Sequence, residues 1–269
     1  MYQTYKPKSQ HLRKYIQEFT VLEDTGIFPK EYFAFPHNIG AIVFLENAVL
    51  DFESAILKID KNPITNSSVI SIGKYLEPLF VRYEHFVNEI AINFTPTGMN
   101  YFMDEHFLEI ANLPIQELKN IEFSQFSKKI FTFEKADRIE QLELFLMQQL
   151  REKNILILEE VVKLLEADKS LKFKDICNDL TISERTLNRL FHKHMGCSPK
   201  DYKKIIRFRG AIKDYQKNEF NLTEIGLQND YYDSPHFSRE FKKLTNQNPK
   251  DYFKQLTYTS NKEYPYIFK

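Results

Sequence analysis

Residues 183–202 read SERTLNRLFHKHMGCSPKDY, and much of this pattern returns fifty residues later. The run SPKDY at 198–202 recurs as NPKDY at 248–252. The same offset of 50 pairs Leu187, Arg189, Phe191 and Lys193 with Phe237, Arg239, Phe241 and Lys243. Upstream the offset is 49, because Ile176 pairs with Ile225, and one inserted residue is best tolerated in a turn. The repeat indicates that one structural unit occurs twice.

The first copy predicts a helix, a tight turn and a second helix. Phe173, Ile176 and Leu180 recur at helical spacing, and residues 181–182 form the turn. Ser183 is the expected N-cap of the second helix, because its hydroxyl can accept hydrogen bonds from unpaired backbone amides. One face of that helix carries Leu187, Leu190, Phe191 and His194.

The second copy predicts the same order of elements. Thr223 is expected to cap a helix that carries Ile225, and residues 229–232 form the turn. Asp233 is expected to cap the next helix. Pro235 then falls in its first turn, where a missing amide costs little.

Between the copies, residues 199–216 have apolar side chains at helical intervals, with Lys and Arg on the other face. The pattern predicts one helix of 18 residues, about 27 Å long at 1.5 Å per residue. Two recognition helices must lie about 34 Å apart to enter successive major-groove segments on one side of DNA. A stiff helix of this length, with the widths of the units it joins, is of that order.

The net charge of zero conceals a difference between the two halves of the chain. Residues 1–169 hold 18 Lys plus Arg against 25 Asp plus Glu, whereas residues 170–257 hold 17 against 11. Binding DNA draws on clustered basic side chains. The distribution predicts an acidic domain attached to a basic module that binds double-stranded DNA.

The two-unit pattern resembles the DNA-binding domain of the AraC/XylS family of bacterial transcription regulators over about residues 155–256. The runs that carry the resemblance are SERTLNRLFHKHMGCSPKDY at 183–202, IIRFRGAI at 205–212, HFSREFKK at 236–243 and NPKDY at 248–252. Two positions depart from the family pattern. Asp230 stands where a turn glycine is usual, and Pro235 stands where a polar residue is common. Asp can adopt the left-handed conformation that such a turn requires.

The resemblance implies which side chains face the DNA. Those facing the base edges of the major groove are Arg185, Asn188, Arg189, Ser234, His236 and Arg239. Arginine pairs with guanine O6 and N7 through two parallel hydrogen bonds, and asparagine can pair with adenine. The side chains expected to touch phosphates are Lys193, Lys203, Lys204 and Lys243. Phosphate contacts position the protein without reading sequence.

The first part of the chain predicts strands. Short segments rich in β-branched and aromatic residues occur at 41–45, 49–52, 69–72, 80–82 and 90–94. Residues 93–98 end the last strand and begin a more helical stretch that includes Phe102, Phe107 and Leu108. The segment is similar to the cupin-like sensor domains that precede the DNA-binding module in many AraC-type regulators. The expected fold class is therefore α+β, a β-rich domain followed by an all-α domain of two helix-turn-helix units joined by a long helix.

An amphipathic helix is expected at 133–150, with Leu142, Phe145 and Leu146 on one face. That face can pair with its twin in a homodimer or pack on its own domain, and both alternatives stay open. Asn154 is expected to cap a helix at 155–167. The predicted division of the chain is a sensor or interaction domain at 1–133, a connector helix at 134–153, the DNA-binding domain at 154–257 and a tail at 258–269.

The composition gives no support for catalysis, a cofactor or a metal site. In the first part of the chain, His11, His37, His85 and His106 have no metal-binding spacing, and the seven glycines of the chain form no phosphate-binding loop. Cys177 and Cys197 are expected to be reduced core thiols. The chain shows neither a signal peptide nor an apolar run of the about 20 residues that span a membrane, so a cytoplasmic location is expected.

The sequence predicts a DNA-binding transcription regulator whose first domain senses a small-molecule effector, mediates dimerisation, or both. The alternatives are a regulator controlled by a protein partner and a small-molecule-modifying enzyme fused to a DNA-binding domain. An aromatic-lined pocket of a few hundred cubic ångströms in the first domain favours a small-molecule ligand, whereas a flat apolar patch favours a protein partner. Whether the regulator activates or represses stays open.

Overall fold

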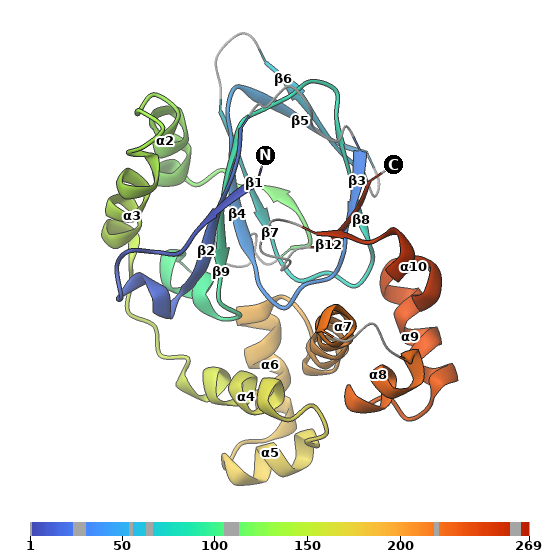
Figure 1. Ribbon diagram of the computed structural model, residues 1–269. Helices are drawn as coiled ribbons and strands as arrows, with labels where there is room; N and C mark the ends of the chain where they lie inside the picture. Colours follow the sequence, from blue (N-terminus) through green and yellow to red (C-terminus); the bar gives the residue numbers. More distant parts are fainter. Residues whose placement is uncertain are drawn as a thin grey trace.

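A computed structural model describes residues 2–23, 31–53, 56–62, 67–104, 113–217, 221–258 and 265–268. A β-rich part comes first and a helical part follows it, which confirms the expected α+β class. In Figure 1 the strands form an upper body, two helices cover one side of it, and the remaining helices lie beneath.

The strands form two six-stranded sheets. The first has the order β1 (Tyr2–Tyr5), β2 (Ile16–Leu22), β9 (Glu89–Phe94), β4 (Ala41–Leu45), β7 (Ser68–Ile72) and β10 (Gln116–Glu117). The second has the order β11 (Thr257–Tyr258), β12 (Pro265–Phe268), β3 (Glu31–Ala34), β8 (Leu79–Tyr83), β6 (Ile56–Lys61) and β5 (Ala48–Glu53). The pairs are antiparallel except β6 with β8, which is parallel. All five segments expected to be strands lie within β4, β5, β7, β8 and β9.

Several strands were not expected from the sequence. β2 reads IQEFTVL and β6 reads ILKIDK, so charged residues interrupt their apolar pattern. β12 pairs with β3 through Tyr266 opposite Ala34 and Phe268 opposite Tyr32, so part of the expected tail at 258–269 belongs to the second sheet. Long-range pairing of this kind leaves little trace in local sequence.

β4 and β9 are covered on both faces, which explains their continuous apolar runs. All five residues of β4 are buried. Val43 points into the space between the sheets and packs with Ile70 and Val81. Phe44 points outward, where its ring stacks on Phe123 with centroids 6.2 Å apart. A strand buried on both faces does not alternate between apolar and polar residues.

Helices α2 (Ile121–Ile130) and α3 (Arg138–Gln149) cover the outer face of the first sheet, as Figure 1 shows. The helix expected at 133–150 is α3, and it begins five residues later than expected, at Arg138. Its guanidinium donates hydrogen bonds to the carbonyls of Phe131 and Phe133, which holds the preceding segment in a turn. The Phe145 ring stacks on Phe126 with centroids 4.1 Å apart, so the apolar face of α3 packs within its own chain.

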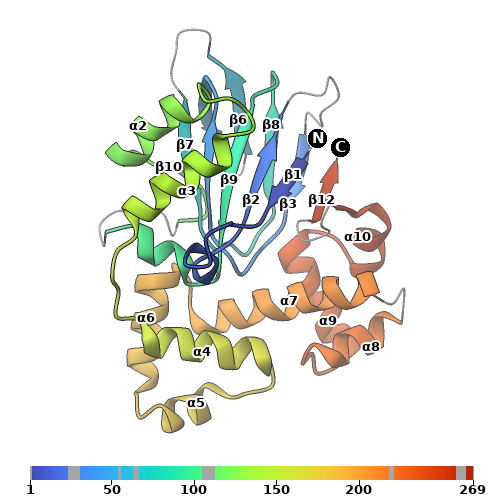
Figure 2. The same ribbon diagram turned by 60° about the vertical axis from the view of Figure 1, so that its left-hand side comes forward.

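Seven helices of the described chain make up the helical part. They are α4 (Leu156–Ala167), α5 (Phe173–Asp179), α6 (Glu184–Met195), α7 (Pro199–Lys217), α8 (Leu222–Gln228), α9 (Ser234–Thr245) and α10 (Pro249–Gln255). Figure 2 shows α7 lying beneath the sheets, with α4 to α6 near one end and α8 to α10 near the other. Two expected caps are wrong. Ile155, not Asn154, is the N-cap of α4, and Asn221, not Thr223, caps α8 by accepting a hydrogen bond from the Thr223 amide.

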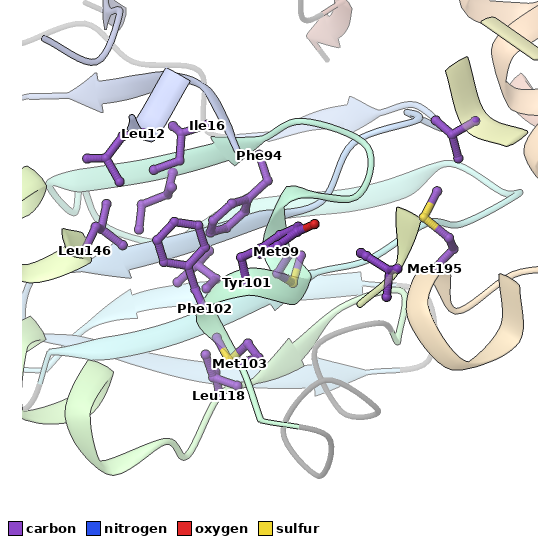
Figure 3. Close-up of a cluster of buried hydrophobic side chains, with 14 of the residues drawn as sticks. Leu12, Ile16, Phe94, Met99, Tyr101, Phe102, Met103, Leu118, Leu146 and Met195 are labelled. Atoms are coloured by element: carbon purple, nitrogen blue, oxygen red, sulfur yellow. The ribbon is translucent and has the colours of Figure 1, made fainter. Parts of the chain in front are cut away.

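The first helix-turn-helix unit shares its core with the β-rich part. The 3₁₀ helix η2 (Gly98–Phe102) supplies Met99 and Phe102, and α6 supplies Met195 to the same buried cluster (Figure 3). Phe102 thus ends a short helical turn, whereas Phe107 and Leu108 lie outside the described residues. Asn100 joins the two parts through two hydrogen bonds to His194, one to its carbonyl and one with its ring.

Candidate nucleic-acid interface

The two repeat copies fold into matching helix-turn-helix units. Ser183 caps α6 by accepting from the Thr186 amide, and Asp233 caps α9 by accepting from the His236 amide. The caps lie exactly one repeat apart, which confirms both expected positions. The C-cap residues that follow these helices are Gly196 after α6 and Asn246 after α9. Both have a left-handed backbone, with φ of 68° and 58°. The local sequence therefore sets the start and end of both second helices.

The turns of both units contain a left-handed residue at equivalent positions. These are Thr181 with φ 55° and Asp230 with φ 61°. Four residues separate α5 from α6, and five separate α8 from α9. The extra residue follows Asp230, which confirms that the change of repeat offset lies in the second turn. Asp230 therefore keeps the backbone geometry of the glycine that it replaces.

α6 presents three of the expected base-reading side chains to solvent. Leu187, Phe191 and Met195 are buried on one side of the helix. Arg185, Asn188 and Arg189 are exposed on the other, near its N-terminal end. Asn188 donates from Nδ2 to the Glu184 carbonyl at 2.8 Å. The C-terminal end of α6 contacts η2 through His194, so the end that carries the arginines is the one left uncovered.

On α9, fewer of the expected base-reading side chains are exposed to solvent than on α6. Arg239 is exposed, as its equivalent Arg189 is. Ser234 and His236 are half-buried. His236 accepts a hydrogen bond from the Tyr232 amide at Nδ1, and its Nε2 lies 3.4 Å from Glu240. Of the three expected base-reading residues on α9, the structure leaves Arg239 the most accessible.

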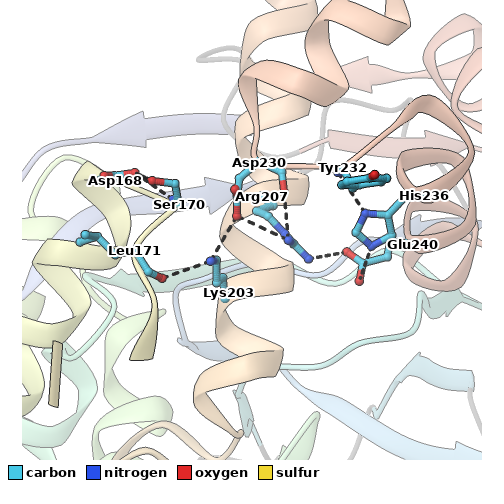
Figure 4. Close-up of polar contacts among 9 residues, drawn as sticks. All are labelled: Asp168, Ser170, Leu171, Lys203, Arg207, Asp230, Tyr232, His236 and Glu240. Carbon is cyan, nitrogen blue, oxygen red and sulfur yellow. Dashed lines mark hydrogen bonds and ion pairs between the residues drawn. The ribbon is translucent and has the colours of Figure 1, made fainter. Parts of the chain in front are cut away.

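A polar network on α7 joins the second unit to the first (Figure 4). Arg207 donates to the Asp230 carbonyl at 3.1 Å and to Glu240 of α9 at 2.6 Å. Its guanidinium lies 4.9 Å from the centre of the Tyr231 ring. Lys203 lies 3.2 Å from the Asp230 carboxylate and donates to the Leu171 carbonyl at 3.2 Å. Because Leu171 precedes α5, Lys203 ties the start of the first unit to the turn of the second.

The loop before α5 has its own local support. The Ser170 hydroxyl and amide both donate to Asp168, at 2.7 and 2.8 Å. These hydrogen bonds hold the pKa of Asp168 below its ordinary value. The loop that presents the Leu171 carbonyl to Lys203 is thereby ordered.

The expected phosphate-contacting lysines differ in their surroundings. Lys243 is exposed on α9, and Lys193 is half-buried on α6. Lys204 is 40% exposed and lies 2.8 Å from Asp201. Lys203 is only 16% exposed, and its amine contacts both Asp230 and the Leu171 carbonyl. Sequence analysis missed Arg207 and Glu240, although the unusual Asp230 in the turn was a signal that the turn has charged partners.

The β-rich part encloses a separate cavity of about 130 Å³ between the two sheets. A smaller cavity of about 60 Å³ adjoins it and shares several of its walls. The lining common to both includes Tyr32, Ala34, Tyr75 and Glu89. All the described residues that line the two cavities belong to the β-rich part.

The described residues hold no group of three or more His, Cys, Asp and Glu side chains that could bind a metal ion. Cys177 and Cys197 are buried and not bonded to each other. Burial raises the pKa of both thiols, that of Cys197 to about 11. Among the described helices, none combines the length and apolar character needed to cross a membrane.

The family match to this chain lies in the helical part. A family model described as a helix-turn-helix domain matches residues 176–255. The chain is 27% identical over 96 residues to the HTH-type transcriptional regulator GbdR of Pseudomonas aeruginosa, which covers 35% of this chain and 26% of that protein. It is 31% identical over 75 residues to the HTH-type transcriptional activator RhaS of Pectobacterium atrosepticum, which covers 28% and 27%. The matches thus span about a quarter of the length of these curated relatives.

Among solved structures, ToxT from Vibrio cholerae aligns over 93% of this chain and 97% of its own. The TM-score is 0.49 and the sequence identity is 14%.

Proposed function

The C-terminal part of this chain is a helix-turn-helix domain of the AraC/XylS family, and from that premise we propose that the chain is a sequence-specific DNA-binding transcription regulator. The observation that carries the proposal is the pair of matching units fixed to one helix. α7 has 19 residues, about 28 Å at 1.5 Å per residue, and its side chains contact both units. A rigid helix of this length, with the widths of the units it joins, is of the order of the about 34 Å that separates successive major-groove segments on one side of a duplex.

Base reading is assigned mainly to the exposed side chains of the recognition helices. Arg185, Asn188 and Arg189 would read one segment, and Arg239 the other. Ser234 and His236 would assist from α9, His236 after exchanging its contact with Glu240 for DNA. Phosphate contacts are assigned to Lys193, Lys204 and Lys243, and Lys203 is assigned to the internal network.

The β-rich part is proposed to sense a small-molecule effector. The support is the cavity between the sheets, because a concave, mostly apolar site with a few polar groups is typical of small-molecule binding. Its volume of about 130 Å³, with 60 Å³ adjoining, is below the expected few hundred cubic ångströms, so it suits only a small ligand. A flat apolar patch, which would favour a protein partner, is the weaker alternative. An enzymatic first domain is the least supported alternative, because the helical part and its relatives indicate a transcription regulator.

A homodimer is the proposed assembly. The inner face of α3 is used within the chain, so a partner copy would meet its outer side, where Leu144 is 54% and Met147 is 42% exposed. Analytical ultracentrifugation of the wild type and of a Leu144→Glu variant tests this surface. A dimer in the wild type that persists unchanged in the variant places the dimer contact elsewhere.

The test of the DNA-binding function is selection of bound duplexes from a random pool by the full-length chain. We expect enrichment of a sequence with two segments about 10 base pairs apart, centre to centre. A variant with both Arg185→Ala and Arg189→Ala should lose that enrichment while still retaining duplexes weakly. Failure of the wild type to enrich any sequence contradicts the proposal.

A matched pair of lysine variants separates phosphate contact from internal support. Lys204→Ala should weaken binding to all sequences alike and lower the slope of log affinity against log salt by about one, because one fewer counterion is released. Lys203→Ala should leave the slope unchanged, because its amine lies between Leu171 and Asp230. Equal changes in slope for the two variants would show that Lys203 leaves its internal contacts when DNA binds.

A further inference from the structure

Small side chains from both sheets line the cavity between them. Ala34 of β3, Ala41 of β4 and Ala91 of β9 all line it. Larger neighbours such as Leu22, Val43 and Ile72 complete an apolar wall. Because protein interiors are packed with few voids larger than a water molecule, three alanines around one space leave room that a ligand can fill.

Glu89 is the exceptional residue of this wall. The described chain buries three carboxylates, at Glu18, Glu89 and Glu143, each at most 8% exposed. Glu18 lies 3.4 Å from the Lys6 amine. Glu143 accepts from the backbone amides of Lys8 and Ser9 at 2.7 and 3.0 Å. Glu89 accepts only from the Tyr83 hydroxyl within the described chain, so it lacks both a cation and backbone amides.

Two further polar groups of the cavity, on Tyr75 and Asn93, offer acceptor oxygens. Tyr75 gives its hydroxyl proton to the Phe35 carbonyl at 2.7 Å, so its oxygen can only accept. Asn93 donates from Nδ2 to Thr20 at 2.8 Å, which leaves its carbonyl oxygen for other partners. The second oxygen of Glu89 also has no donor among the described residues. A ligand group that contacts these three oxygens must supply hydrogen-bond donors.

The lack of a cation beside Glu89 among the described residues affects the pKa of its carboxyl group. Burial raises its pKa from 4.5 to about 8. A buried carboxylate without a cation resists ionisation, and a bound cation removes that penalty. The rings of Tyr32 and Tyr83 lie beside it, with centroids 6.3 Å apart, and ring faces attract cations.

We propose that the cavity between the sheets binds a small primary amine, with the ammonium paired to Glu89 and an apolar body packed among Ala34, Ala41 and Ala91. The amine would donate to Glu89 and to whichever of Tyr75 and Asn93 it reaches. Positive charge and three donors distinguish an ammonium from a hydroxyl or a carboxylate. This inference rests on the proposed sensing function and names the chemical class of its effector.

The volume limits the size of the amine. A cavity of about 150 Å³ lined by apolar side chains holds benzene. The cavity of about 130 Å³, extended by the adjoining 60 Å³, therefore suits a body of about that size with a short aminomethyl arm. Benzylamine fits this description and serves as the probe, with benzyl alcohol and benzoate as neutral and anionic counterparts.

The test is isothermal titration of the full-length chain with the three probes. For the wild type we expect benzylamine to bind at least about tenfold more tightly than benzyl alcohol, since a hydrogen bond to a charged group contributes about 1.5 to 3 kcal/mol. Benzoate should not bind. Glu89→Gln keeps the shape and the acceptor for Tyr83, so it should lose the preference for benzylamine and still bind benzyl alcohol.

Two further variants complete the test. Glu18→Gln neutralises a buried carboxylate that already has a lysine partner, and it should leave the benzylamine preference unchanged. Ala91→Leu fills the cavity and should abolish binding of both benzylamine and benzyl alcohol. Equal affinity for amine and alcohol in the wild type, or an amine preference that survives in Glu89→Gln, overturns the inference.

Failure of this inference can be distinguished from failure of the proposed function. Operator binding is measured by the same chain with and without benzylamine. Amine binding through Glu89 without any effect on operator affinity would keep the cavity inference and refute the sensing function. Operator binding without any amine binding would refute the cavity inference and leave the proposed DNA-binding function standing.

Discussion

Arg189 and Arg239 occupy the same place in the two repeat copies, and both are exposed. Arg189→Ala should lose about 1 to 3 kcal/mol of operator binding and relax the preference at one base pair, because a paired contact to guanine disappears. Arg239→Ala should lose less, since α9 offers one exposed base-reading residue where α6 offers three. The measurement is a titration of each variant with operator and scrambled duplex at several salt concentrations. Equal weakening on both duplexes by Arg189→Ala would identify the residue as a phosphate contact.

Glu89 predicts a pH dependence of stability. Its pKa is about 8 in the folded chain against an ordinary value of 4.5, so the folded state holds the proton that the unfolded state has released. The free energy of unfolding therefore falls as the pH rises from about 4.5 to 8. Glu89→Gln should be at least about 1 kcal/mol more stable than the wild type at pH 8, since one pKa unit corresponds to 1.36 kcal/mol. At pH 4.5 the two should be nearly equal.

Lys74 predicts how the free energy of unfolding changes at higher pH. Its pKa is lowered by burial from 10.5 to about 8, and its amine donates to the Pro96 carbonyl. The unfolded state then holds the extra proton, so stability should rise as the pH rises from about 8 to 10.5. Urea unfolding of wild type, Glu89→Gln and Lys74→Met across pH 4.5 to 10.5 measures both the fall in stability below pH 8 and the rise above it. A wild-type curve that is flat between pH 4.5 and 8 contradicts the assignment to Glu89.

At the scale of elements, the two turns of the repeat provide a matched pair. Thr181 and Asp230 share a left-handed backbone, but only Asp230 pairs with side chains of α7. Thr181→Gly should stabilise the chain by up to about 1 kcal/mol, because a β-branched residue is strained in that conformation. Asp230→Gly relieves the same backbone strain, but it removes the carboxylate that pairs with Lys203 and Arg207, and Arg207 then keeps only Glu240. We therefore expect it to destabilise the chain by about 1 to 2 kcal/mol.

The two glycine variants, Thr181→Gly and Asp230→Gly, should also differ in DNA binding. Loosening the second turn frees α9 from α7, so Asp230→Gly should also reduce operator specificity, whereas Thr181→Gly should not. Urea unfolding and operator titration of both variants provide the comparison. If both glycine variants stabilise the chain, the ion pairs of Asp230 contribute nothing to the link between the units.

For the whole molecule, the shared core predicts cooperative unfolding of the β-rich part with the first helix-turn-helix unit. Asn100→Ala removes both hydrogen bonds to His194 and leaves buried polar groups without partners. It should cost about 1 to 3 kcal/mol while preserving a single transition. Asn38→Ala removes an exposed contact to Glu166 of α4 and serves as the control, with a smaller expected loss. Two separate transitions in the wild type, followed by circular dichroism and by hydrogen exchange, would show that the parts fold independently.

Local signals explain why the helical part could be predicted from the sequence. Ser183 and Asp233 act within three residues as caps, and the apolar spacing of α6 and α9 lies within single helices. The expected caps Asn154 and Thr223 were wrong by one and two positions, which is the usual uncertainty at helix ends. The strands at β4 and β9 could be predicted because both of their faces are buried, whereas charged residues concealed β2 and β6.

By itself, the sequence determined the repeat, its caps and spacing, and the residues on the outward faces of α6 and α9, because these depend on neighbours only a few positions away. Tertiary structure alone decided that Lys203 lies between Leu171 and Asp230, that α3 packs on its own sheet, and that Glu89 faces a cavity. Each of these depends on which distant segments lie side by side. Strand pairing and core packing bring such segments together through contacts that no local pattern encodes.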